Sequence, residues 1–98
     1  MMTEVILTVV CEHYQIKRLA IGEEVTGRSI QKVVEAKQTA AYFLWRHTRL
    51  TRDHIANILG YHRPNNVNMC KNKIKEIMSA NKGFAADLGT MESKILRD

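Results

Sequence analysis

Two short amphipathic patterns, separated by a glycine and a proline, constrain the fold of this chain more than any other feature of its sequence. In the first pattern, Ile55, Ile58 and Leu59 are spaced as on one face of a helix. Thr51 lies just before them and is a favourable N-cap. Gly60 suits the end of this helix, because glycine adopts the left-handed conformation found there without a steric cost. The sequence therefore predicts a short helix that begins after Thr51 and ends near Gly60.

A second, longer helix is predicted for residues 64–79. Pro64 suits the first helical position, where its missing N–H is not needed. A proline also disfavours helical backbone angles at the residue before it, so Arg63 is expected to be the N-cap. At about 100° per residue, the apolar residues fall on one face, which is expected to be buried. That face consists of Val67, Cys70, Ile74, Ile77 and Met78.

The opposite face of this predicted helix carries Asn65, Asn68, Met69 and Asn72. Asparagine is a mediocre helix former, so three asparagines on one exposed stripe do not serve to stabilise the helix. An asparagine amide pairs bidentately with adenine in the DNA major groove. Two helices joined by a tight turn, the second with such a face, have the outline of a helix-turn-helix, here about residues 51–79. The alternative is that the asparagines form only a solvated surface.

The distribution of charge supports a nucleic-acid partner. The net charge is +5, and seven basic and two acidic residues lie between Arg46 and Glu76, so this stretch carries the whole excess. A local excess on the predicted reading element is better explained by contacts to phosphates than by solubility. Double-stranded DNA is therefore the predicted partner, while the oligomeric state does not follow from the sequence.

The remaining patterns predict an all-α fold, a small helical bundle in a single domain that spans all 98 residues. The first stretch is rich in β-branched residues, so a strand is the alternative there. Thr3 is expected to cap the first helix and Ser29 the long one. The long helix is expected to bury Ile30, Val33, Val34, Ala40, Ala41 and Leu44. The predicted elements are helices over 4–13, 30–47 and 84–96, a helical turn over 17–21, a loop over 22–27 and a break over 81–83.

These residues resemble the C-terminal DNA-binding domain, domain IV, of DnaA, the bacterial chromosomal replication initiator. The resemblance runs from about Ile6 to about Ile95, and it rests on four segments. VVCEHYQIK resembles the opening helix and turn of that domain, VVEAKQTAAYFLWRHTRLT its long helix, HIANILGY the first helix of its helix-turn-helix and VNMCKNKI the second. The spacing from Lys37-Gln38 through Gly60 to Val67 fits without a gap. The resemblance implies a fold like that of the Trp repressor and a role in replication initiation or its regulation.

The signature of that family around the turn is Gly-Arg-Asp-His-Ser/Thr-Thr-Val, and this chain departs from it. Residues 61–67 read YHRPNNV, so the residues that read the family's DNA site are replaced and the recognised sequence should differ. An arginine that enters the minor groove in the family is Lys37 here, which keeps the charge but not the planar fork. The residues expected to face bases are Arg63, Asn65, Asn66, Asn68 and Asn72. Those expected to hold the DNA backbone are Lys37, Arg49, Thr51, Arg52 and Lys71.

Two other functions are compatible with the predicted fold. One is a protein-interaction module that has lost specific DNA binding, because proline and asparagines stand where the family has its base-reading residues. The other is a transcription regulator or a DNA-binding protein of a mobile element. The chain contains no G-x-x-x-x-G-K-S/T motif, so the nucleotide-binding domain of the full initiator is not part of it.

Other functional classes find little support in the sequence. His47, His54, His62 and Cys70 have no metal-ligand spacing, and no residues suggest a catalytic triad, so no metal, cofactor, small-molecule substrate or enzymatic activity is expected. Both cysteines, Cys11 and Cys70, are expected to be reduced core residues, and Tyr42, Phe43 and Trp45 to pack in the core. The chain has no apolar run of about 20 residues and no basic leader, so no membrane contact and a cytoplasmic location are expected.

Overall fold

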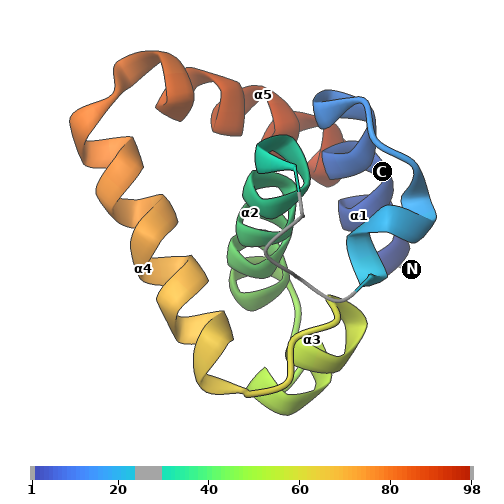
Figure 1. Cartoon of the computed structure of the whole chain (residues 1–98). Helices are drawn as coiled ribbons and strands as arrows, with labels where there is room; N and C mark the ends of the chain where they lie inside the picture. Colours follow the sequence, from blue (N-terminus) through green and yellow to red (C-terminus); the bar gives the residue numbers. More distant parts are fainter. Residues whose placement is uncertain (1, 24–29, 98) are drawn as a thin grey trace.

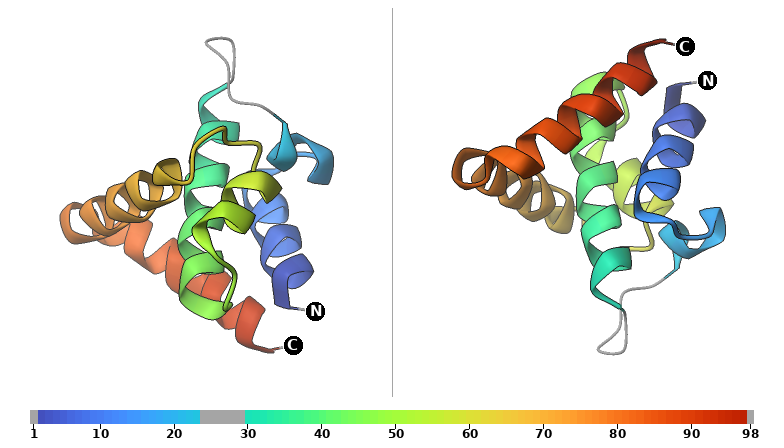
Figure 2. Two further views of the ribbon diagram at one scale, coloured as in Figure 1. Left: turned by 90° about the horizontal axis from the view of Figure 1, so that it is seen from below. Right: turned by 90° about the horizontal axis from the view of Figure 1, so that it is seen from above.

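The helix α2, Gln31–His47, runs through the middle of the computed structural model, which describes residues 2–23 and 30–97. It contacts α1, α3, α4 and the short 3₁₀ helix η1, and α5 packs on α1 and α4 (Figure 1). Figure 2 shows α2 between α4 on one side and α1 on the other. Within the described residues every regular element is helical, which confirms the all-α prediction. The other elements are α1 (Met2–Tyr14), η1 (Arg18–Gly22), α3 (Arg52–Ile58), α4 (Asn65–Ala80) and α5 (Lys82–Arg97).

Small side chains allow α2 to occupy this central position. Ala36, Ala40 and Ala41 are completely buried, so neighbouring helices approach its backbone closely. Phe43 and Leu44, two larger side chains near its C-terminal end, are also buried. The result is one continuous hydrophobic core with contributions from all five helices and η1.

Several predicted helix boundaries need correction. Thr3 does not cap α1, because the helix already begins at Met2. The strand alternative for this stretch is wrong, since its apolar residues Ile6, Leu7 and Val10 form one buried helical face. Ser29 and most of the predicted loop over 22–27 lie outside the described residues.

The N-terminal ends of α2 and α5 also differ from the prediction. Ile30 was expected in the core but is 56 % exposed, because it precedes α2 with an extended backbone and does not follow the helical stripe. The break predicted for 81–83 is confined to Asn81. Its Oδ1 accepts a hydrogen bond from the Phe84 N–H at 3.0 Å, and this cap lets α5 begin directly at Lys82.

The segment from α3 to α4 forms largely as its residues predict. The Thr51 hydroxyl accepts a hydrogen bond from the His54 N–H at 3.2 Å, which confirms the N-cap. Gly60 follows α3 with a φ of +74°. Pro64, not Arg63, directly precedes α4, and it already has helical backbone angles, φ −58° and ψ −30°. The boundary therefore differs from the predicted one by a single residue.

Gly60 is required at its position for a second reason, which gives a prediction. A Cβ added there would lie 2.5 Å from the carbonyl oxygen of Gly22 and 2.8 Å from that of Glu23. Gly60→Ala is expected to destabilise the protein by about 1–3 kcal/mol in urea unfolding, from backbone strain and from this clash. Gly89 is the matched control, because a Cβ there meets nothing within 4 Å inside α5. Gly89→Ala should stabilise the protein by about 0.5–1 kcal/mol, and equal effects of both changes would contradict the account.

Candidate nucleic-acid interface

The helical phase predicted for α4 is confirmed. Val67, Cys70 and Ile74 are at most 6 % exposed and face the bundle. Ile77 and Met78, predicted to share that face, are only partly buried, because α4 extends past the centre of the core at this end. The outward side has Asn65 and Asn72 exposed, Asn68 partly exposed and Met69 61 % exposed.

Asn66 does not belong to this outward stripe. It is partly buried on the flank of α4 that faces α2, where it lines a groove with Val34, Gln38 and Met69. The structure therefore brings Asn65, Asn68 and Asn72 together and places Asn66 to one side of them.

Three arginines around α3 and α4 are exposed: Arg49, Arg52 and Arg63. Within the described parts of the chain, no carboxylate forms a salt bridge with any of them. Arg46 differs, since its Nε lies 2.9 Å from Glu92 Oε2 of α5. The His47 Nε2 lies 2.8 Å from the same oxygen. The positive charge of Arg46 is thus used within the bundle, whereas that of the three arginines is available for a ligand.

Lys37 is not at the surface, and its predicted contact with the DNA backbone or minor groove is wrong for this structure. The side chain is 1 % exposed. Its Nζ donates hydrogen bonds to the carbonyl oxygens of Ile21 at 2.9 Å, of Leu59 at 2.5 Å and of Glu23. These carbonyls lie at the ends of η1 and α3, where helical partners are missing. Lys37 therefore joins both ends to α2.

Burial shifts the pKa values of the groups around Lys37. It lowers the pKa of the Lys37 ammonium, which the carboxylate of Glu23 partly opposes. Burial also raises the pKa of Tyr61 and that of the Cys70 thiol. The Cys70 Sγ donates to the Tyr61 hydroxyl at 3.3 Å. Cys70 is a buried core residue without a disulfide, as predicted, and so is Cys11.

Thr51 and Lys71, the other predicted backbone contacts, lie at the edges of this surface. Thr51 is exposed, and its hydroxyl, which accepts a bond as the cap of α3, still has a hydrogen to donate. It lines a concavity between α3 and the start of α4, together with His54, Tyr61 and Pro64. His54 is exposed as well.

Trp45 and Lys75 are residues of this region that the sequence analysis missed. Tyr42 and Phe43 are buried as expected, but Trp45 is 39 % exposed. The ammonium groups of Lys71 and Lys75 lie 4.4 Å and 4.7 Å from the centre of its ring. The available signal was the spacing of the two lysines, one helical turn apart on one flank of α4.

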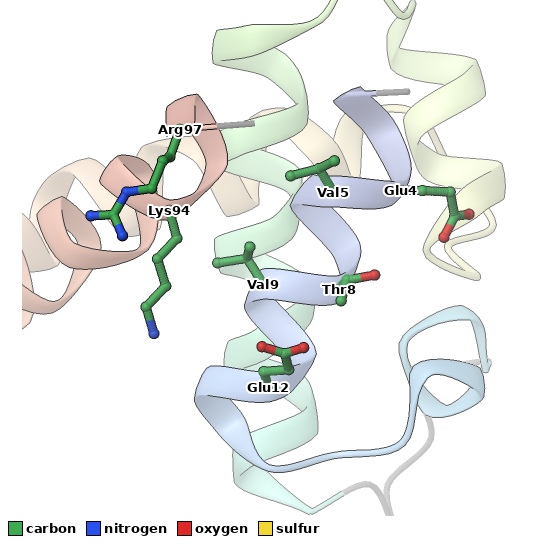
Figure 3. Close-up of a pocket in the computed structure, with 7 residues that line it drawn as sticks. All are labelled: Glu4, Val5, Thr8, Val9, Glu12, Lys94 and Arg97. Carbon is green, nitrogen blue, oxygen red and sulfur yellow. The ribbon is translucent and has the colours of Figure 1, made fainter.

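A separate groove lies between α1 and α5 (Figure 3). The side chains of Val5 and Val9 point toward α5, and Lys94 and Arg97 form its other wall. Glu4 also lines this groove, and its carboxylate forms a salt bridge with Arg18 at 2.8 Å. Arg18 itself does not line the groove. The groove thus combines the apolar side chains of Val5 and Val9 with the charged side chains of Glu12, Lys94 and Arg97.

The described residues form neither a metal cluster nor a membrane-spanning helix. Within 2–23 and 30–97, no group of three or more His, Cys, Asp or Glu side chains is placed to hold a metal ion. None of the helices in those ranges is both long and apolar enough to cross a membrane.

Comparisons of the sequence with protein-family models and with curated proteins find no match. The resemblance to the DnaA domain therefore stays a prediction from the sequence.

Proposed function

We propose that this chain binds duplex DNA, with α3 and α4 as a helix-turn-helix and α4 in the major groove. One observation carries the proposal. The outward asparagines of α4 are flanked by exposed cations that have no carboxylate partner within the described residues. Amides that present both a donor and an acceptor suit base edges, and unpaired cations suit the phosphates on either side.

The roles follow from the positions of the side chains. Asn65, Asn68 and Asn72 contact base edges, and Arg63 reaches the groove from the residue before Pro64. Asn66, on the flank beside α2, contributes at the edge of the interface. Phosphates are held by Arg49, Thr51, Arg52 and Lys71. Lys37 has no direct role, because its ammonium group is committed to three backbone carbonyls.

The resemblance to domain IV of DnaA extends this proposal to replication initiation or its regulation. The target sequence is expected to differ from that of the family, because residues 61–67, YHRPNNV, replace the family's base-reading signature. In addition, Lys37 is buried and does not reach the DNA. A transcription regulator or a mobile-element protein would use the same surface of α4.

The second candidate is a protein-interaction module without specific DNA binding. Met69 favours it, since this apolar side chain is 61 % exposed on the outward side of α4. A large exposed apolar residue beside a groove is a common feature of protein-binding surfaces. The two candidates differ in how binding depends on salt.

Binding to duplex DNA is expected to weaken steeply with salt. Neutralisation of about four to six phosphates gives a slope of about −4 to −5 in a plot of log K against log salt concentration. Fluorescence anisotropy of a labelled random-sequence duplex, measured between low and moderate KCl, gives this slope. A slope near zero, or no binding at low salt, would favour the interaction module.

A further inference from the structure

Trp45, Lys71 and Lys75 form a cluster on the outside of the bundle, which we call the indole–lysine cluster. The two ammonium groups lie 4.4 Å and 4.7 Å from the ring centre, distances at which the negative face of an indole attracts a cation. Trp45 comes from the C-terminal end of α2, and both lysines come from α4. The cluster therefore links the central helix to the flank of the helix that carries the asparagines.

The indole ring of Trp45 packs against a buried side chain of the same helix. The ring of Tyr42, which is 5 % exposed, lies 6.2 Å from that of Trp45. The Arg46 guanidinium donates to the Tyr42 hydroxyl at 3.4 Å, and Arg46 is itself bound to Glu92. Trp45 thus packs against a buried, hydrogen-bonded neighbour while 39 % of it remains accessible.

An indole orients a lysine without neutralising it. Arg18 and Arg46 are paired with carboxylates, so their charges are compensated inside the protein. Lys71 and Lys75 have no such partner in the described part of the chain. Their ammonium groups are therefore restricted in position but keep a full charge and free N–H donors for an anion.

The neighbours of these lysines on α4 indicate which anion they would meet. Residues three or four apart are adjacent on a helix, so Lys71 lies beside Asn68 and Lys75 beside Asn72. Phosphates line the edges of the groove in which a recognition helix lies, next to the bases. Lys71 and Lys75 are four residues apart, about 6 Å along the axis of α4, so both would face the same edge of the groove in which α4 lies.

We propose that the indole–lysine cluster is a phosphate-binding site for one strand of duplex DNA, with Trp45 as the residue that positions both ammonium groups. This inference rests on the proposed function and adds Trp45 and Lys75 to its contacts. Both ammonium groups lie over the ring, so an unpaired base would have to displace them to stack there. The cluster is therefore assigned to phosphates and not to bases.

The first test compares salt dependences of binding to one duplex. The double variant Lys71→Ala/Lys75→Ala should bind with a slope smaller by about 2, because each lost phosphate contact removes about 0.9. Lys94→Ala is the matched control, an exposed lysine of α5 outside the cluster, and should leave the slope unchanged. An unchanged slope in the double variant, with wild-type binding intact, would overturn the inference and remove Lys71 from the phosphate contacts. Binding of duplex DNA through the asparagines of α4 and the three exposed arginines would still stand.

Substitutions of Trp45 test positioning. Trp45→Leu keeps apolar volume but removes the π face, and should weaken DNA binding by about threefold to tenfold at fixed salt, since both lysines must then be ordered on binding. Trp45→Phe keeps a π face and should recover most of the affinity. Thermal unfolding of both variants, followed by circular dichroism, checks that they remain folded. If Trp45→Leu binds as tightly as the wild type or more tightly, Trp45 does not position the lysines.

The chain contains one tryptophan, which provides a readout that a purely structural role would not move. Saturation with duplex DNA should reduce the acrylamide quenching of Trp45 fluorescence, because the bound strand covers the ring. Unchanged quenching at saturation would mean that DNA docks elsewhere, which overturns the inference alone. No binding of any duplex at low salt would overturn both the inference and the proposed function.

Discussion

Val67→Asp is expected to abolish cooperative folding of the protein. Val67 is 1 % exposed on the face of α4 that also buries Cys70 and Ile74. A carboxylate placed there would be removed from water, and a buried charge costs several kcal/mol. A small domain has a total stability of about 5–15 kcal/mol, so one such change consumes much or all of it.

The neighbouring position supplies the control for this substitution. Asn68→Asp introduces the same charge one residue later, on the outward side of α4, and should change the free energy of unfolding by about 0.5 kcal/mol or less. Circular dichroism during thermal unfolding distinguishes the two variants. A cooperative transition of Val67→Asp near the wild-type temperature would mean that the phase of α4 is wrong.

Lys37→Met is expected to destabilise the protein by about 2–4 kcal/mol, because it leaves the carbonyls of Ile21 and Leu59 without their donor in a buried site. Methionine keeps much of the length of the side chain, so the loss comes from hydrogen bonds and not from a large cavity. The control is Lys73→Met, which changes an exposed lysine of α4 and should stay within about 0.5 kcal/mol of the wild type.

Urea unfolding of both variants measures this difference. If Lys37 were a DNA contact, as the resemblance implied, Lys37→Met would keep its stability and lose affinity for DNA. A variant with wild-type stability would therefore contradict the buried position of Lys37 and restore the earlier assignment.

The sequence predicted the surface helices well because each buries only one face. In α4 and α5 the apolar residues recur at helical spacing, and Val67, Ile74, Leu88 and Ile95 are buried as that spacing indicates. Gly60 was recognisable as well, since a left-handed residue after a helix is a local requirement of the backbone.

The central helix α2 was harder to predict, because a helix surrounded by others has no solvent-facing stripe along its middle. Lys37 was assigned to the DNA backbone from the resemblance, although Ala36, Thr39 and Ala40 around it are small residues typical of close helix packing. Its three acceptors come from η1 and α3, so their position depends on tertiary structure. Trp45 was missed for the converse reason, since aromatic residues usually pack in the core.

The most direct test of the central claim, that α4 reads DNA with its outward asparagines, compares one variant on two duplexes. Selection from a random duplex pool first supplies a preferred site, and a scrambled duplex serves as the second. Asn68→Ala should lose about 1–3 kcal/mol of binding free energy on the preferred duplex and little on the scrambled one. Arg52→Ala, a phosphate contact, should weaken both by similar factors. Equal effects of Asn68→Ala on both duplexes, or no effect on either, would contradict base reading by α4.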